Sequence, residues 1–197
     1  MEETHTRRPS SGVRRIWWFP PLPAGAKVCE IGSGEGHFVR AAKARGWIVE
    51  HFDPMTGGPT AERWASLVPW TLPEPNHYDV IFAWQVLEHL HDPWTVARAV
   101  RRGLHPDGYF VLSIPSRRSL EAWLMGDRWE ARHTGHLSEW SPRTIRGFLE
   151  ACGFHRVRIL HQRIVKHVRG PWWFTLALGC VVAALRISSR ITVVARP

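Results

Sequence analysis

Short apolar runs alternate with helical patterns through most of this chain of 197 residues. The run at 78–83 is continuous, as in a strand that is buried on both faces of a parallel sheet. Strands are expected at 27–31, 47–52, 78–83, 109–114, 155–165 and 191–195. Helices are expected at 37–45, 60–67, 92–102 and 141–152, with a turn at 104–108. This alternation predicts an α/β fold, in which right-handed crossovers join the strands of a parallel sheet.

The segment from Glu30 to Gly36 joins the first strand to the first helix. It reads Glu-Ile-Gly-Ser-Gly-Glu-Gly, so an acid ends the strand and glycine occupies every second position of the turn. Glycine adopts backbone angles that a β-carbon penalises, and it lets a ligand approach the main chain. The third glycine comes one residue earlier than in the G-x-G-x-x-G fingerprint of dinucleotide sites. The spacing therefore favours a nucleoside with an amino-acid tail over a pyrophosphate; a tight turn without a ligand is the alternative.

Two further segments are expected beside this turn. Asp53 ends the second strand, roughly 20 residues past the glycines, where a carboxylate can accept hydrogen bonds from two ribose hydroxyls. A turn or cap before Pro54 is the other interpretation of this acid. Trp84 and Gln85 follow the strand at 78–83. The carboxyl ends of parallel strands share one edge of a sheet and ligands bind there, so these segments predict one nucleotide site.

The stretch from Tyr78 to Pro93 contains the longest motif in the chain. It reads Tyr-Asp-Val-Ile-Phe-Ala-Trp-Gln-Val-Leu-Glu-His-Leu-His-Asp-Pro. It resembles the F-D-x-V-x-x-x-x-V-L-E-H-L-x-D-P pattern of class I S-adenosylmethionine-dependent methyltransferases. The glycine turn resembles that family's first motif, [DE]-x-G-x-G-x-G, and residues 104–109 resemble its L-x-P-G-G turn, with Asp107 at one glycine position. Residues 114–116, 136–141 and 152–154 resemble the small-molecule branch of the family, which includes ubiquinone-biosynthesis O-methyltransferases and enzymes from polysaccharide and secondary-metabolite pathways. The whole resemblance covers about residues 26–165 and the last strand.

The resemblance implies a fold, a cofactor and its site. The expected fold is doubly wound, with a mostly parallel Rossmann-like sheet and a C-terminal antiparallel strand. Residues 1–25 are expected to form an N-terminal tail and aromatic-proline arm, and 26–197 a methyltransferase domain with an apolar insertion at 166–189. The segment before Leu72 is shorter than usual in the family, so the third strand is expected to be reduced. The S-adenosylmethionine site is expected to comprise Glu30, Gly32, Ser33, Gly34, Gly36, Asp53, Leu72, Trp84 and Gln85.

Candidate catalytic residues follow the strand at 78–83 and lie in the loop after the strand at 109–114. Methyl transfer is an in-line displacement that depends mostly on positioning, and a base is needed only when the nucleophile is protonated, as a phenol is. His89, His133 and His136 are candidate bases, because an imidazole titrates near working pH. Glu88 either orients His89 or caps a helix. Since the chain has 12 histidines, a structural or solvated role is the alternative for each of them.

The same segment bears on metal binding. Some ubiquinone-pathway relatives bind a divalent metal through acids here. In this chain Gln85 occupies one of the acidic positions, and a carboxamide is a weaker ligand for a hard cation than a carboxylate. We therefore expect no metal.

The net charge of +9 comes entirely from the last third of the chain. Residues 140–197 contain 10 Lys and Arg and one acid, Glu150, whereas 1–139 contain 16 charges of each sign. This distribution predicts an anionic partner (a membrane surface, an acidic substrate or nucleic acid) or a solvated basic face. The three cysteines form no C-x-x-C pair and the N-terminal segment does not resemble a signal peptide, so we expect reduced thiols and a cytoplasmic protein.

The insertion contains 16 consecutive uncharged residues, 170–185, between basic flanks. It is shorter than the roughly 20 residues that span a bilayer. Three interpretations remain: a core helix, a lid over an apolar substrate, or a segment in the membrane interface with tryptophan and arginine at the headgroups. The last two imply a hydrophobic, small-molecule acceptor, and the third places the protein peripherally on the inner membrane face.

Methylation of a small acceptor, with O-methylation favoured, is the leading functional hypothesis. A nucleic-acid methyltransferase is disfavoured because Ala83-Trp84-Gln85-Val86 replaces the N-P-P-Y-like residues of base-modifying enzymes. A nicotinamide oxidoreductase is disfavoured by the glycine spacing. A non-catalytic, cofactor-binding scaffold at a membrane or partner protein remains an alternative.

Overall fold

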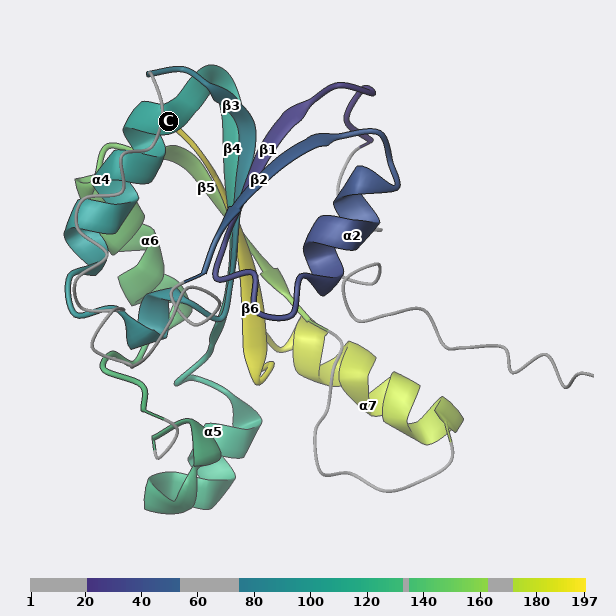
Figure 1. Cartoon of the computed structure of the whole chain (residues 1–197). Helices are drawn as coiled ribbons and strands as arrows, with labels where there is room; N and C mark the ends of the chain where they lie inside the picture. Colours follow the sequence, from purple (N-terminus) through teal and green to yellow (C-terminus); the bar gives the residue numbers. More distant parts are fainter. Residues whose placement is uncertain (1–20, 54–74, 133–134, 163–171) are drawn as a thin grey trace, which may run out of the picture.

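A single mixed sheet organises the protein (Figure 1). The computed structural model describes residues 21–53, 75–132, 135–162 and 172–197. Six strands follow the order β2-β1-β3-β4-β6-β5. Their bounds are β1 Lys27–Ile31, β2 Ile48–Phe52, β3 Tyr78–Trp84, β4 Leu104–Pro115, β5 His155–His161 and β6 Arg190–Arg196. The pairs β1–β2, β1–β3 and β3–β4 are parallel, and β6 pairs antiparallel with both β4 and β5. The C-terminal strand is therefore the one that runs against the others.

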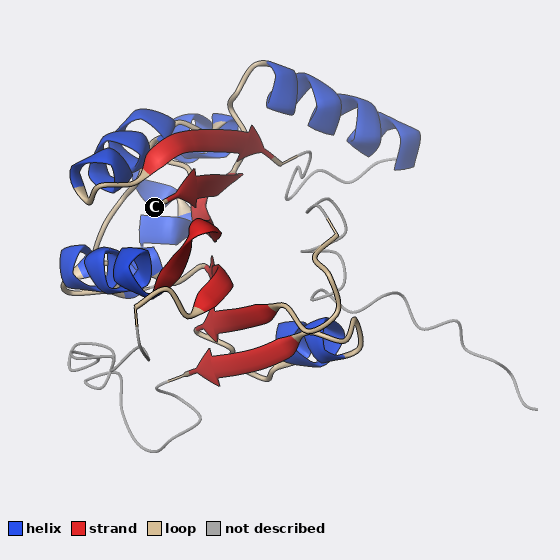
Figure 2. Cartoon of the chain, turned by 90° about the horizontal axis from the view of Figure 1, so that it is seen from above, coloured by secondary structure: helices blue, strands red, loops and turns tan. Residues whose placement is uncertain are grey.

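Helices cover both faces of this sheet (Figure 2). Helix α2 lies on one face, and α4 and α6 lie on the other. Two further helices, α5 and α7, project beyond one edge of the sheet. The helices are α2 His37–Lys43, α4 Pro93–Gly103, α5 Leu120–Met125, α6 Pro142–Ala151 and α7 Trp172–Ala184, with single 3-10 turns at η1 Leu87–His89, η2 Gly126–Arg128 and η3 Glu130–Arg132. The fold is the expected doubly wound α/β class.

The core has one layer on each face of the sheet. On the α2 face, Phe38 packs between Phe82 and Trp84, with ring centroids 4.6 and 5.7 Å away. The opposite face is larger and contains the apolar sides of α4 and α6, with Ile145 and Leu149 fully buried. Side chains alternate between the two faces along each strand, so the continuous apolar run of β3 supplies both layers.

Short polar motifs fix where the helices on the larger face begin. The Asp92 side chain accepts a hydrogen bond from the backbone N–H of Thr95 at 3.0 Å, and Pro93 occupies the first position of α4. Ser141 and Thr144 form a reciprocal capping box at the start of α6. These caps satisfy N–H groups that a helix leaves without a partner in its first turn.

Most predicted strands and helices are confirmed, but two regions differ from the prediction. Residues 104–108, expected to form a turn, begin β4 instead. Tyr78 pairs with Leu104 and Val80 pairs with Tyr109, so β3 advances by two residues where β4 advances by five. The register of the two strands therefore shifts here, and β4 begins irregularly. Helix α5 was not predicted, because its six residues are too few to show a helical period. The predicted helix at 60–67 lies outside the described residues.

Candidate cofactor and catalytic site

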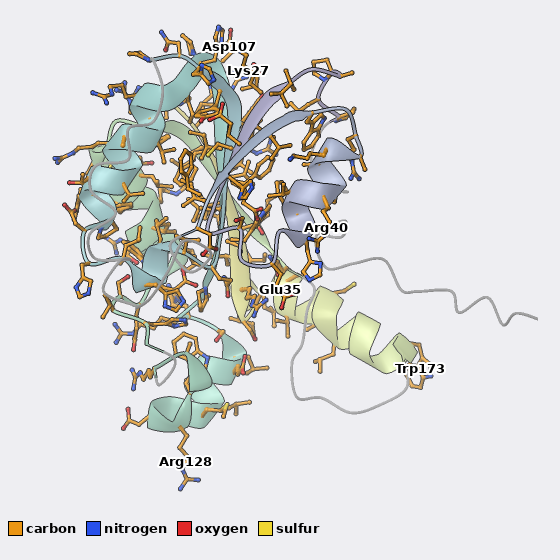
Figure 3. The ribbon with its side chains drawn as sticks, viewed as in Figure 1. Lys27, Glu35, Arg40, Asp107, Arg128 and Trp173 are labelled. Carbon is orange, nitrogen blue, oxygen red and sulfur yellow. The ribbon has the colours of Figure 1, made fainter. Side chains whose placement is uncertain are left out.

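The carboxyl ends of β1, β2, β3 and β4 all face the same edge of the sheet, because these strands pair in parallel. The chain passes from β1 outward to β2 and then returns to β3 on the other side of β1. The switch point of the sheet therefore lies between β1 and β3, where ligands bind in open α/β sheets. In Figure 3, Glu35 of the glycine turn lies on this side, and Lys27 and Asp107 lie at the opposite edge.

The glycine turn requires the conformations that its sequence predicts. Gly32, Gly34 and Gly36 have φ values of 71°, 50° and 71°, all in the left-handed region. A β-carbon is strained there, so any other residue would destabilise the turn. The turn closes with a hydrogen bond from the Gly36 N–H to the Ser33 carbonyl at 2.9 Å. Because glycine has no side chain, the backbone of the turn is uncovered at these three positions.

Three contacts join the glycine turn to the end of β2. The Gly32 N–H donates to the Phe52 carbonyl at 2.7 Å, and the Gly34 N–H donates to the Asp53 carboxylate. The Ser33 hydroxyl shares a hydrogen bond with His51 Nδ1 at 3.0 Å. Asp53 thus lies directly against the turn, as its position in the sequence predicts.

Glu30 ends up deep in the sheet, with 1% of its surface exposed, one residue before the end of β1. Trp84 is also largely buried, and its indole stacks on Phe82 with ring centroids 5.6 Å apart. Gln85 comes next and is half-buried. Its φ of 58° is unusual for a residue with a β-carbon, and such strain is often found at functional sites. Its backbone N–H donates to the Ser113 carbonyl at 2.9 Å, which ties the end of β3 to β4.

Glu88, His89 and His136 come together just beyond the end of β3. Glu88 and His89 lie on η1, and His136 lies on the loop between η3 and α6. The two imidazole rings meet edge to face, with centroids 4.6 Å apart. One donor atom from each of the three residues lies within 4.8 Å of the other two. The loop is held by its backbone, because the N–H groups of Leu137 and Ser138 both donate to the Glu88 carbonyl, at 2.7 and 3.2 Å.

Burial sets the charge state of this cluster. The pKa of Glu88 is raised to about 8 by burial, against the opposing effects of its own backbone N–H and of Arg190. The pKa of His136 is lowered by burial first and then by the neighbouring His89. A hydrogen bond to the backbone of Ala131 opposes that change. Near neutral pH the cluster therefore contains a neutral His136 imidazole and a largely protonated Glu88.

Two predicted site residues, Leu72 and His133, lie outside the described residues. Most of the other predicted residues form two groups at one edge of the sheet: the glycine turn with Asp53, and the cluster after β3. Glu30 lies within β1, and Trp84 and Gln85 lie at the end of β3 and directly after it. Ser113 and Gly135 were not predicted from the sequence; Ser113 accepts a hydrogen bond from the Gln85 side chain, and the Gly135 carbonyl accepts one from His89. No motif marks Ser113, and Gly135 contributes only its backbone carbonyl.

Comparisons with known proteins show the family and the fold of the chain. A family model described as "Methyltransferase domain" matches residues 1–159. A methyltransferase of Mycobacterium sp. (strain KMS) is 32% identical over 99 residues, which are 46% of this chain and 39% of that protein. The ubiquinone biosynthesis O-methyltransferase of Yersinia enterocolitica is 39% identical over 51 residues, which are 26% of this chain and 21% of that protein. The matches thus span well under half the length of these two relatives.

Solved structures show the same fold. A SAM-dependent methyltransferase from Archaeoglobus fulgidus superposes with a TM-score of 0.64 at 17% identity, over 94% of this chain and 92% of that one. Phosphoethanolamine N-methyltransferase 2 of Haemonchus contortus, solved with S-adenosyl-L-methionine, superposes with a TM-score of 0.60 at 13% identity, over 94% and 51%. The family model covers most of the chain, so the chain belongs to the methyltransferase domain family.

Proposed function

We propose that this protein transfers a methyl group from S-adenosylmethionine to an oxygen atom of a small, apolar acceptor. The main support for the proposal is the arrangement of residues at the switch point of the sheet, between β1 and β3. A backbone turn suited to a nucleoside lies there beside Asp53, and a cluster suited to activating a hydroxyl lies one strand away. Family membership supports methyl transfer, and the partial match to a ubiquinone biosynthesis O-methyltransferase favours oxygen as the acceptor atom.

The cofactor site would be built from β1, β2 and β3. Gly32, Gly34 and Gly36 let the nucleoside approach the backbone, and the Asp53 carboxylate accepts hydrogen bonds from its ribose hydroxyls. Ser33 holds the turn through His51. Glu30, Leu72, Trp84 and Gln85 complete the proposed site, where Trp84 acts by packing beneath it rather than from the surface.

The bound cofactor supplies an electrophilic methyl group on a sulfonium, and the acceptor oxygen displaces the thioether while its proton is lost. The chain must hold the three atoms nearly in line and provide a destination for that proton. His136 is the proposed proton acceptor, because its imidazole is neutral near pH 7. His89 and Glu88 fix it in place, through the ring contact and through the backbone bonds from Leu137 and Ser138.

The apolar character of the acceptor is inferred from α5 and α7. Both helices project past the edge of the sheet on which the proposed site lies (Figures 1 and 3). The two helices, with Leu185 directly after α7, expose large apolar side chains, which on a monomeric surface are normally scattered: Trp123 78%, Leu124 67%, Trp173 59%, Val181 52% and Leu185 63%. Arg128 lies at the outer end of the α5 projection (Figure 3).

An anionic bilayer is the partner that fits these projections. Their apolar side chains suit the acyl boundary, and the +9 charge of the chain suits anionic headgroups. Within the part of the chain that the structure describes, none of the helices combines the length and apolarity needed to cross a bilayer. We therefore propose that the protein binds a membrane peripherally, with the methylation site turned toward it.

Turnover on a panel of alkylated phenols and catechols tests this function. Formation of S-adenosylhomocysteine is measured with the full chain and with the His136→Ala variant. We expect turnover on apolar hydroxylated acceptors and a loss of about 100-fold or more in kcat for the variant, the range of general acid–base catalysis. If the folded protein binds S-adenosylhomocysteine but methylates none of these acceptors, the oxygen-acceptor proposal fails and a scaffold or another acceptor class replaces it.

A further inference from the structure

Exposed arginines gather on the face of the sheet that α4 and α6 cover. Helix α4 contributes three of them, α6 contributes two and the first half of β5 contributes two. The set, which we call the arginine surface, is Arg98, Arg101, Arg102, Arg143, Arg146, Arg156 and Arg158. The same three elements contain one acid, Glu150, and no lysine. The surface therefore carries seven positive charges against one negative charge.

The three elements form one continuous surface. Helices α4 and α6 lie side by side on the same face of the sheet (Figures 1 and 2). Arg101 of α4 donates from Nε to the Gly153 carbonyl, between α6 and β5, at 2.8 Å. Arg146 of α6 donates from Nη1 to the Val157 carbonyl of β5 at 2.6 Å. Because these bonds hold two of the guanidinium groups in place, a ligand that binds them costs less side-chain entropy.

The charge of the arginine surface is not neutralised within the described part of the protein. None of its seven arginines forms an ion pair with a carboxylate of the described residues. Like charges on one surface repel each other and disfavour the compact state, and an anionic ligand relieves that repulsion. The planar guanidinium also donates two parallel hydrogen bonds to a phosphate, which lysine cannot do. The surface therefore suits a ligand with several phosphate groups.

Trp94 lies among these arginines and exposes 42% of its surface. Its ring meets that of Phe148 with centroids 4.7 Å apart, and the Arg98 guanidinium lies 5.9 Å from its centroid. A charge that can bind phosphate thus lies directly beside an aromatic ring on which a base can stack. Proteins that bind single-stranded nucleic acids combine these two features, a basic surface that follows the backbone and aromatic side chains that stack on bases.

We propose that the arginine surface binds the phosphate backbone of a single-stranded nucleic acid, with a base stacked on Trp94. An acidic protein segment would match the charge but would not use the tryptophan ring in this way. A bilayer fits less well, because Trp94 is the one large apolar side chain that α4 and α6, both described in full, expose. Membrane-binding surfaces add several apolar side chains to the basic ones, as α5 and α7 do.

The nucleic acid is a binding partner in this proposal and not the methyl acceptor. The residues after β3 still disfavour methylation of a base, and none of the seven arginines belongs to the cluster of Glu88, His89 and His136. The proposal therefore goes beyond methyl transfer and does not depend on which acceptor the enzyme uses.

Fluorescence anisotropy with labelled single strands tests the surface. RNA and DNA of mixed sequence are titrated separately with the full chain; about 20 nucleotides exceed the sites of about 4–16 nucleotides that a single-strand-binding domain covers. We expect saturable binding to at least one of them. For about five phosphate contacts, binding should weaken roughly 100-fold between about 50 and 200 mM salt, since each contact contributes about −0.7 to the slope of log K against log salt.

Two variants separate the charges from the ring. Arg102→Gln with Arg156→Gln should weaken binding and reduce the steepness of the salt slope by about 1.4, the share of two contacts. Trp94→Leu keeps an apolar side chain, and it should weaken binding by about 5-fold or more with the salt slope unchanged. The matched control is Arg118→Gln with Arg128→Gln, which removes two exposed charges near α5 and should bind within twofold of the wild type.

Thermal melts confirm that each variant is folded, and three further outcomes would overturn the proposal. Equal weakening by both arginine pairs would show attraction to the whole chain rather than to this surface. Displacement of the strand by polyglutamate at equal charge, with Trp94→Leu having no effect, would assign the surface to an acidic protein. Vesicle binding that requires Arg102 and Arg156, with no binding of either strand at about 50 mM salt, would assign it to the membrane.

Discussion

Replacing Asp53 with alanine is expected to weaken cofactor binding without unfolding the protein. The Asp53 carboxylate accepts the N–H of Gly34 and is the proposed acceptor for the ribose hydroxyls. The side chain is half-buried at the end of β2, outside both core layers. Its loss therefore removes polar contacts at the glycine turn and leaves the packing of the sheet in place.

The size of the effect follows from the number of hydrogen bonds to the carboxylate. A hydrogen bond to a charged group contributes about 1.5–3 kcal/mol, and two ribose hydroxyls would each donate one. The loss of about 3 kcal/mol or more corresponds to a Kd for S-adenosylhomocysteine that rises roughly 100-fold or more. Asp53→Asn keeps an oxygen acceptor for the Gly34 N–H but loses the charge, so we expect a smaller increase of about 10-fold.

Calorimetric titration of the wild type and both variants measures these values, with NAD as a control ligand. Thermal melts show whether the variants remain folded, and Asp79→Asn, at the opposite end of the sheet, controls for the loss of a surface charge. A folded Asp53→Ala variant that binds S-adenosylhomocysteine within twofold of the wild type would refute the role of this carboxylate.

Three further predictions concern stability and membrane binding. Gly108→Ala should lower the free energy of unfolding by about 1–3 kcal/mol, as measured by urea titration. The new β-carbon would lie 2.9 Å from the carbonyl oxygens of Asp79 and His105. The control is Gly147→Ala, on α6 with open space around it, which should be neutral or stabilising. Asp92→Ala should cost about 1 kcal/mol near pH 7 through the lost cap of α4. Hydrogen bonds from Thr95 lower the pKa of Asp92 in the folded protein. The stabilisation by the cap is therefore fully present above the unfolded pKa of about 4, and it should disappear as the pH falls through the lower folded pKa. Thermal melts of the wild type and of Asp92→Ala over the acid range would show this loss. Replacing Trp123 and Leu124 together with serine should reduce sedimentation with vesicles that contain phosphatidylglycerol and leave the melting temperature unchanged; equal sedimentation of both proteins would remove α5 from the membrane-binding surface.

Local sequence predicted the elements that form the proposed cofactor site. The segment from Glu30 to Gly36 combines a strand, glycines at positions that need left-handed angles, and a following helix, so its conformation depends mainly on its own residues. Asp53 could be placed beside it because parallel strands end at one edge. The irregular start of β4 was missed, because residues 104–108 have the composition of a turn and only their pairing with β3 makes them a strand.

The cluster after β3 was only partly accessible from the sequence. His89 and His136 were identified one at a time as histidines in suitable segments. Their contact depends on how the loop after β4 folds back, which is fixed by backbone hydrogen bonds to the Glu88 carbonyl that no side-chain pattern encodes. The full burial of Glu88 is likewise a tertiary property, because a lone acid beside a histidine is usually solvated.

Amide chemical shifts locate the cofactor most directly. The full ¹⁵N-labelled chain is titrated with S-adenosylhomocysteine, and its backbone N–H resonances are followed. We predict that the resonances of Gly32, Gly34 and Gly36 shift saturably, while those of Gly25 and Gly108 at the opposite edge of the sheet do not, and that NAD causes no such change. Saturable shifts centred on Gly25 and Gly108, or none at all in the folded protein, would contradict a cofactor site at the glycine turn.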